Sequence, residues 1–212
     1  MSLPPRVGVL ALQGDWAAHV EALGAAAARS GRVVEISATR CPADLTGLDG
    51  LVIPGGESTT LLKLLAMEGL DAAIGRWVRE GEGCVFGTCA GAILLSRHVR
   101  SPEQGSLGLL DAVIERNSYG RQVDSFIESL PTGAGSELGA APLEAVFIRA
   151  PRFLEVGKGV EILLARGDEP VLVRQGRVLA ATFHPEMTKD TRVHGLFLQM
   201  LDPERETDRL SG

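Results

Sequence analysis

Short apolar segments alternate with amphipathic ones through the first half of the chain. The first of them, residues 6–12 (R-V-G-V-L-A-L), is apolar on both faces, which is typical of a buried strand in a parallel sheet. This strand–helix–strand order predicts a three-layer α/β fold, with a mostly parallel central sheet and helices on both faces. The expected strands are residues 6–12, 32–37, 50–53 and 84–86. The expected helices are residues 16–30, 61–67, 70–80 and 93–97.

The second half of the chain is richer in antiparallel signals. Two apolar segments, residues 171–174 and 177–182, flank Gln175-Gly176, which predicts a two-residue hairpin. A final helix is expected from about residue 190, and residues 131–142, rich in Gly, Ala and Ser, are expected to form an exposed excursion. Further strands are expected at residues 109–115, 143–149 and 160–165.

The length and composition of the chain suit a single globular domain. Its 212 residues are 45% hydrophobic, so we expect one domain over residues 1–202 and a charged, frayed tail at residues 203–212. No apolar run approaches the roughly 18 residues that a membrane span needs. A net charge of −6 without a basic stripe argues against binding to nucleic acid.

The cysteines indicate a reducing compartment. There are three, Cys41, Cys84 and Cys89, and no two of them have C-x-x-C spacing. An odd count with this spacing predicts neither a disulfide framework nor a zinc site. The first residues also lack the basic and apolar regions of a signal peptide. We therefore expect a cytoplasmic protein without a metal.

The strongest candidate for chemistry is the Gly-x-Cys-x-Gly pattern around Cys89. Residues 85–92 read as a short buried strand, a sharp turn and the start of a helix, with the cysteine at the turn. A nucleophile on such a strained turn needs small neighbours two residues away, and Gly87 and Gly91 meet that need. The N–H groups of the following helix favour a thiolate and can hold an oxyanion. The alternative is a buried structural cysteine beside two packing glycines.

A second candidate is the loop at residues 54–60 (P-G-G-E-S-T-T), which follows the third expected strand. Adjacent glycines allow a backbone N–H to approach a ligand closely, and ligands of open α/β sheets bind at the carboxyl ends of strands. Ser58 or Thr59 is expected to cap the next helix. An ordinary capped turn is the alternative.

One of the four histidines is a candidate catalytic base. His184 follows a buried strand, and Glu186 comes two residues later. Pro185 disfavours a helical conformation at His184, so we expect an extended segment in which Glu186 reaches one imidazole nitrogen and the other faces a thiol. A surface loop that happens to hold both residues is the alternative. We expect partly exposed or packed helix-face positions for the other histidines, His19, His98 and His194.

The two motifs Gly-Thr-Cys-Ala-Gly and His-Pro-Glu, in this order, resemble the class I glutamine amidotransferase family of triad-type glutaminases. Three further segments strengthen the resemblance: residues 8–15 (G-V-L-A-L-Q-G-D), 115–122 (E-R-N-S-Y-G-R-Q) and 147–151 (F-I-R-A-P). With the loop at residues 54–60, they are most similar to the branch formed by the glutaminase subunits of pyridoxal 5′-phosphate synthases. Ala18 departs from the pattern, because an acidic residue is expected before His19.

The resemblance implies a role for each matching residue. Cys89 attacks the side-chain amide of glutamine, His184 carries the proton to the leaving ammonia, and Glu186 orients His184. Backbone N–H groups of Gly56 and Ala90 form the oxyanion hole. The residues expected to contact glutamine are Gly56, Glu57, Ser58, Arg116, Ile148 and Arg149. Their charges agree with this role, because glutamine carries an α-carboxylate and an α-ammonium group.

The resemblance also implies a partner and no cofactor. Ammonia would pass to a separate (β/α)₈-barrel synthase subunit within a heteromeric complex, and this chain would be nearly idle until it docks. Three alternatives stay open: the glutaminase component of another amidotransferase, a protease or chaperone-like protein with a cysteine elbow, and a non-catalytic binding module.

Overall fold

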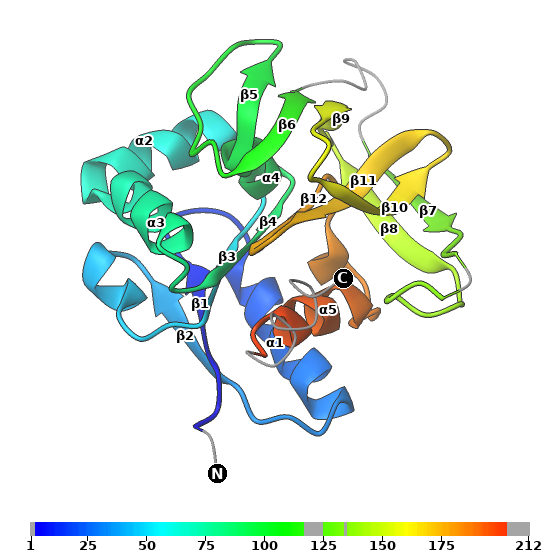
Figure 1. The fold of residues 1–212 in the computed structure, drawn as a ribbon, viewed down its shortest axis with the longest axis horizontal. Coiled ribbons are helices and arrows are strands. Elements are labelled where there is room, and N and C mark those ends of the chain that lie inside the picture. The colour runs from blue at the N-terminus through cyan, green and yellow to red at the C-terminus, as the bar shows by residue number, and fades with distance from the viewer. Residues whose placement is uncertain (1–2, 117–124, 134, 203–212) are drawn as a thin grey trace.

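The computed structural model describes residues 3–116, 125–133 and 135–202. Within them, a seven-stranded sheet has the order β10-β11-β12-β4-β3-β1-β2 (Figure 1). The strands from β12 to β2 pair in parallel, whereas β10, β11 and β12 pair antiparallel. The predicted fold class is therefore confirmed. The strands of this sheet are β1 (Arg6–Leu10), β2 (Glu35–Thr39), β3 (Gly50–Ile53), β4 (Cys84–Thr88), β10 (Glu161–Arg166), β11 (Glu169–Gln175) and β12 (Val178–Ala181).

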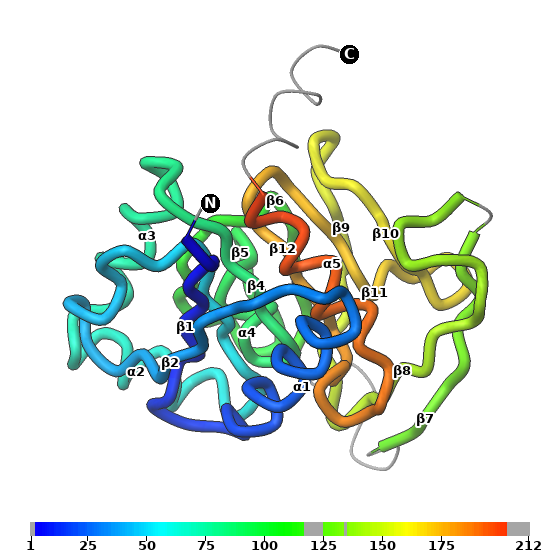
Figure 2. The backbone as a smooth tube through the Cα atoms, turned by 90° about the horizontal axis from the view of Figure 1, so that it is seen from below, coloured from blue at the N-terminus to red at the C-terminus, as the bar shows by residue number. Residues whose placement is uncertain are grey.

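Helices cover both faces of the sheet, as Figures 1 and 2 show. One hydrophobic core lies under α2, α3 and α4, and a second lies under α1 and α5. Alternate residues of a strand point to opposite faces, so Leu51 and Ile53 of β3 join the first core and Val52 joins the second. The helices are α1 (Trp16–Arg29), α2 (Ser58–Glu68), α3 (Leu70–Arg79), α4 (Ala90–Leu95) and α5 (Arg192–Met200). Over the described residues, none of them is long and apolar enough to cross a membrane.

Two smaller sheets contain the strands that the sequence predicts least well. The first has the order β5-β6-β9, and the second pairs β7 with β8. The expected helix at residues 93–97 is wrong in its second part, because α4 ends at Leu95 and β5 begins at Ser96. β7 and β9 were not expected from the sequence. The strands are β5 (Ser96–Arg100), β6 (Leu110–Glu115), β7 (Ser125–Leu130), β8 (Leu143–Ile148) and β9 (Arg152–Val156).

The excursion at residues 131–142 is mostly exposed, as expected, but it is anchored to the domain. Leu138 is buried in the core under α1 and α5. The Glu137 carboxylate accepts hydrogen bonds of 2.6 and 3.2 Å from the buried Arg174 guanidinium. Arg192 donates to the carbonyl oxygen of Leu138 at 2.8 Å and to that of Pro142 at 2.7 Å. Residue 134 and the expected tail at residues 203–212 lie outside the described residues, so the division into domain and tail stays a prediction.

Two glycines allow the turn from β4 into α4. Cys89, between these two elements, has a φ of 46°, a backbone conformation that side-chain-bearing residues rarely adopt. A Cβ atom added to Gly91 would lie 2.1 Å from the carbonyl oxygen of Ile53. One added to Gly87 would lie 2.6 Å from the carbonyl carbon of Gly91. The expected need for small residues at both positions is confirmed.

This packing predicts opposite effects of the same substitution at two glycines. Gly91→Ala places a methyl group against the β3 backbone and is expected to lower the free energy of unfolding by about 1–3 kcal/mol. Gly24→Ala, in α1, meets no heavy atom within 4 Å and is expected to raise it by about 0.5–1 kcal/mol. Urea denaturation of both variants measures the difference. A Gly91→Ala variant as stable as the unmodified protein would show that α4 is free to move away from β3.

Candidate active site

Cys89 occupies the turn that the sequence predicts. It follows the last residue of β4 and precedes Ala90, the first residue of α4. Its side chain is largely buried, with 7% of the residue exposed, and Sγ lies 4.0 Å from the carbonyl oxygen of Ile148. The N–H of Ala90 has no partner within its own helix, because the first N–H groups of a helix never do. The turn therefore presents a thiol and a backbone donor side by side.

His184 comes to Cys89 because β12 lies beside β4 in the sheet. The two strands pair in parallel, with Ala181 opposite Thr88, so the segments that follow them leave the sheet at the same edge. A Cβ atom added to Gly55 would lie 2.5 Å from His184 Cε1 and 3.4 Å from Cys89 Cβ. The imidazole and the cysteine thus converge on a space that Gly55 leaves open.

The Glu186 carboxylate contacts Nδ1 of the His184 imidazole and orients the ring. His184 Nδ1 lies 2.7 Å from Glu186 Oε1, and the two side chains are 12% and 3% exposed. The segment is not extended as expected, because a short 3₁₀ helix, η2 (Pro185–Met187), begins directly after His184. Proline is well tolerated in the first turn of a helix, where its missing N–H costs nothing. The turn brings the carboxylate back toward its own histidine.

Burial and hydrogen bonding oppose each other in the pKa values of this pair. Burial lowers the pKa of His184, but hydrogen bonds with Cys89 and Glu186 outweigh it and raise the pKa from 6.5 to about 10. Burial raises the pKa of Glu186, but hydrogen bonds with His184 and His19 outweigh it and hold that pKa well below its usual range. At neutral pH the pair is therefore an imidazolium beside a carboxylate. Because Nδ1 is engaged by Glu186, the remaining nitrogen, Nε2, serves Cys89.

The loop after β3 is held by a residue to which the sequence assigned no role. Gly56 has a φ of 146°, and a Cβ atom there would lie 2.3 Å from the end of the Gln13 side-chain amide. The Gln13 amide, oriented to match its neighbours, accepts from the Glu57 N–H at 2.6 Å and donates to the Glu57 carbonyl at 3.2 Å. Gln13 follows β1, so two strand ends meet here. The sequence signal that points to this role is the position of Gln13 in the segment Gln-Gly-Asp, directly after the first expected strand.

The expected glutamine contacts after β3 and β6 are only partly brought together. Arg116 donates to Glu57 Oε1 at 3.1 Å, so the expected cation and anion are paired with each other. Ser58 is buried, and its hydroxyl donates to Gln104 Oε1 at 3.1 Å. Neither Ser58 nor Thr59 caps α2, which begins at Ser58 with Glu57 in the cap position. Of the segment at residues 115–122, residues 117–122 lie outside the described residues.

The remaining expected contacts, Ile148 and Arg149, lie at the end of β8. Ile148, the last residue of β8, directs its carbonyl oxygen toward the sulfur. Arg149 is exposed and has a φ of 44°, which turns the chain sharply at this point. Besides β4, the ends of β3, β8 and β12 lie at Cys89, His184 or Gly55, and residues that follow β1 and β6 contact Glu57.

Two histidines set aside at the sequence level lie next to the site. His19 of α1 and His194 of α5 are both fully buried, which agrees with the packed helix-face positions that were one of the two expectations for them. His19 Nε2 lies 3.1 Å from Thr88 Oγ1 and 3.5 Å from Glu186 Oε1. The positions of these two histidines on their helices predict that they can pack inside the protein, but not what they pack against. The contact between α1 and α5 brings them together next to Glu186. His98 is exposed on β5.

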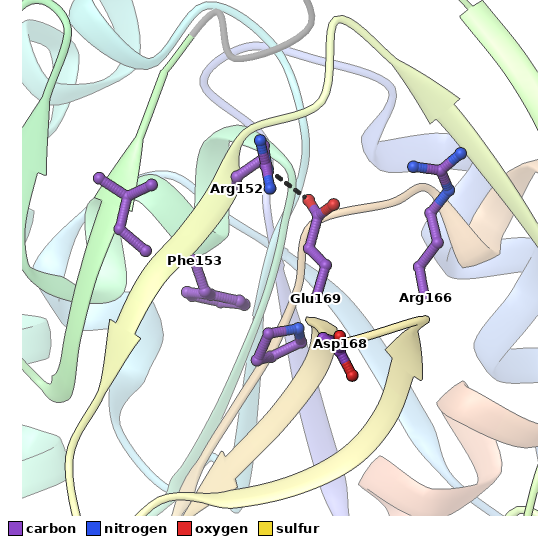
Figure 3. Close-up of a pocket in the computed structure, with 7 residues that line it drawn as sticks. Arg152, Phe153, Arg166, Asp168 and Glu169 are labelled. Carbon is purple, nitrogen blue, oxygen red and sulfur yellow. Dashed lines mark hydrogen bonds and ion pairs between the residues drawn. The ribbon is translucent and has the colours of Figure 1, made fainter.

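A cavity of about 400 Å³ lies apart from these residues, between β9 and the turn joining β10 to β11. Figure 3 shows Arg152 of β9 directed at Glu169 across it, and their side chains form a 3.0 Å ion pair. None of the site residues predicted from the sequence lines it. Among the residues that the structure describes, no group of three or more histidine, cysteine or acidic side chains is placed to bind a metal ion.

Comparison with known proteins identifies relatives over nearly the whole chain. The pyridoxal 5′-phosphate synthase subunit PdxT of one Thermus thermophilus strain is 53% identical over 195 residues, which are 92% of this chain and 96% of the relative. The subunit of the same name from Koribacter versatilis is 49% identical over 199 residues, covering 92% and 95% of the two chains. A solved structure described as a glutamine amidotransferase superposes with a TM-score of 0.82 at 49% identity, covering 92% of this chain and 98% of that one.

The profile of one family covers the same region as these relatives. It matches residues 9–203, which include the loop after β3, the cysteine turn and the His-Pro-Glu segment. The solved glutamine amidotransferase shares the arrangement of helices and sheet into which these segments fold. The chain belongs to the SNO glutamine amidotransferase family.

Proposed function

We propose that this chain is the glutaminase subunit of a pyridoxal 5′-phosphate synthase. It hydrolyses L-glutamine to L-glutamate and ammonia and passes the ammonia to a synthase subunit. The observation that carries the proposal is the placement of the His184 imidazole between the Cys89 thiol and the Glu186 carboxylate. Relatives that are 44–53% identical over 92% of this chain bear the name of that synthase subunit, which supports the choice of pathway.

The first half of the reaction transfers the glutamyl group to sulfur. Cys89 Sγ, as a thiolate paired with the His184 imidazolium, attacks the side-chain amide carbon of glutamine. The carbonyl oxygen takes up the negative charge, and the backbone N–H groups of Ala90 and Gly56 stabilise it. His184 then gives its proton to the amide nitrogen, the C–N bond breaks, and neutral ammonia leaves a glutamyl thioester.

The second half of the reaction restores the enzyme. Neutral His184 accepts a proton from water, which attacks the thioester carbon. The C–S bond breaks, glutamate leaves, and the thiolate–imidazolium pair forms again. Glu186 stays ionised throughout, because it holds the imidazole in one orientation and stabilises its positive charge. The low pKa of Glu186 supports this role.

The partner follows from the chemistry of the product. Ammonia is mostly protonated near neutral pH, and ammonium is no nucleophile, so a sheltered route to the acceptor site preserves its reactivity. A subunit that released ammonia at full rate alone would waste glutamine. We therefore expect docking of the (β/α)₈-barrel synthase subunit to activate this chain.

The first test is ammonia release from glutamine, with and without the cognate barrel subunit. We expect release to rise sharply when the barrel subunit is present and to fall to background in Cys89→Ala. Cys41→Ser, which alters a half-buried cysteine outside the site, is expected to keep full activity. Release that ignores the barrel subunit but disappears in Cys89→Ala would move the chain to another amidotransferase. No release from any combination would contradict the glutaminase proposal.

The depressed pKa of Glu186 predicts how its contribution to stability depends on pH. A carboxyl group whose pKa is lower in the folded state stabilises the fold above its unfolded value near 4.5, and this stabilisation is lost as the pH falls below that value. Glu186→Gln is expected to lower the free energy of unfolding by about 2 kcal/mol at pH 7. Urea denaturation at pH 7 and pH 4 should show the gap between variant and unmodified protein narrowing at pH 4.

The control is Glu103→Gln, which changes an exposed carboxylate in the loop after β5. It is expected to leave the free energy of unfolding nearly unchanged at both pH values. A gap for Glu186→Gln that stays constant between pH 7 and pH 4 would contradict the assignment of Glu186 as a carboxylate held ionised by its neighbours.

The pairing of Arg116 with Glu57 predicts a defect in substrate binding. Arg116→Met removes the cation proposed to bind the α-carboxylate of glutamine. We expect KM to rise by about tenfold or more, in line with the loss of a charge-assisted hydrogen bond, and kcat to change less. Arg6→Met, which breaks the Arg6–Glu35 pair at the opposite edge of the sheet, is the matched control. An unchanged KM in Arg116→Met would exclude this contact.

A further inference from the structure

A chain of buried polar groups continues beyond Glu186 into the contact between α1 and α5. His19 Nε2 faces Thr88 Oγ1 at 3.1 Å and Glu186 Oε1 at 3.5 Å. His19 Nδ1 lies 3.1 Å from His194 Nε2. Both imidazoles are fully buried, and the proposed reaction uses neither of them. Two buried titratable groups in a row are costly, so their placement beside the carboxylate needs a reason.

Hydrogen-bond accounting assigns the proton of each ring. Burial lowers the pKa of His194 from 6.5 to about 3, so this imidazole is neutral and carries a single N–H. His194 Nδ1 is buried without a partner among the described residues, and an unpaired acceptor costs less than an unpaired donor. His194 therefore carries its proton on Nε2 and donates it to His19 Nδ1. Because His19 Nδ1 accepts this hydrogen bond, it carries no proton, and the ring N–H of His19 lies on Nε2, the atom that faces Thr88 and Glu186.

We infer that His19 is a positioning residue whose Nε2–H lies between the Thr88 hydroxyl and the Glu186 carboxylate, and so ties this carboxylate to the last residue of β4, next to Cys89. The inference rests on the proposed glutaminase function. Oε1 of Glu186 then has an imidazole on each side, whereas Oε2 is buried without a hydrogen-bond partner among the described residues. His19 thereby fixes which oxygen faces His184. His194 acts one step further away, since it sets the tautomer of His19.

Aromatic packing holds these rings in place but does not explain their chemistry. The edge of His19 meets Phe86 at 90°, with ring centroids 6.3 Å apart, and His194 meets the same ring at 81° and 5.7 Å. A leucine or phenylalanine at either position would fill the same space without two buried polar nitrogens. If these histidines served only to pack, an apolar replacement would leave kcat unchanged. A loss of kcat therefore distinguishes a polar role from packing.

The kinetic test uses the full chain with its barrel subunit and compares ammonia release by three variants. His19→Leu is expected to lower kcat by about 10–100-fold, the range seen when hydrogen-bond partners that orient metal-binding residues are removed, with KM little changed. His19→Gln is expected to recover most of the lost kcat, because its amide oxygen replaces the Nδ1 acceptor and its amide N–H replaces the Nε2 donor. His98→Leu, which alters the exposed histidine of β5, is expected to behave as the unmodified protein.

A second measurement does not depend on activity. Nitrogen-15 NMR of the histidine-labelled chain reports which ring nitrogen carries the proton, with signals assigned from His19→Gln and His194→Gln. We expect a proton on Nε2 and none on Nδ1 in both rings. The Nδ1–H tautomer of His19 would overturn the inference, and this readout remains valid if His19→Leu does not fold.

The outcomes separate the two proposals. If the unmodified complex releases no ammonia, the glutaminase function fails, and the tautomer measurement alone decides the placement of His19. If the complex is active and folded His19→Leu keeps its kcat within about twofold of the His98→Leu control, the positioning role is wrong. A folded His19→Gln variant no faster than His19→Leu would overturn it as well.

Discussion

The close contact between α4 and β3 is the constraint on which the site depends. The carbonyl oxygen of Ile53 lies where a side chain on Gly91 would be, so α4 approaches the sheet at backbone distance. The chain has only Cys89 with which to turn from β4 into that helix, and its φ of 46° follows. The same turn places the largely buried sulfur at the carboxyl edge of the parallel strands, where the segments after β3 and β12 also emerge. Backbone packing alone thus fixes the position of Cys89, without any contribution from a polar contact.

The polar half of the site is organised by one carboxylate. Glu186 is almost entirely buried, and an isolated buried carboxylate would neutralise itself by taking up a proton. It remains ionised because imidazoles approach it from the position just before η2 and from α1, so the cost of burial is offset by partners from two separate parts of the fold. The charge on His184 depends in turn on Glu186 and Cys89. Each ionised group is therefore stable only while its neighbours stay in place.

The sequence predicted the parts of this arrangement that are local. Gly87 and Gly91 each lie two residues from Cys89, and His184 lies two residues from Glu186. Within each of these two motifs, the short spacing alone restricts the geometry. The contact of His19 with His194 joins residues 175 positions apart, and helical spacing indicates which face of a helix is buried but not what that face meets. β7 was not predicted because its sequence does not alternate between apolar and polar residues. Ile127 is apolar but stands on the solvent-facing side of the strand, where it is 66% exposed.

The two ion pairs of the site differ in their exposure to solvent. The Arg116–Glu57 pair joins a side chain that is 12% exposed to one that is 63% exposed, and solvent-screened ion pairs contribute little to stability. If these two residues bind glutamine as proposed, its charged groups can replace such partners at small cost. The His184–Glu186 pair is buried on both sides, so separating it would leave an uncompensated charge. Under the proposed function, glutamine can therefore rearrange the contacts to its α-carbon end without disturbing the groups proposed to act on its side-chain amide.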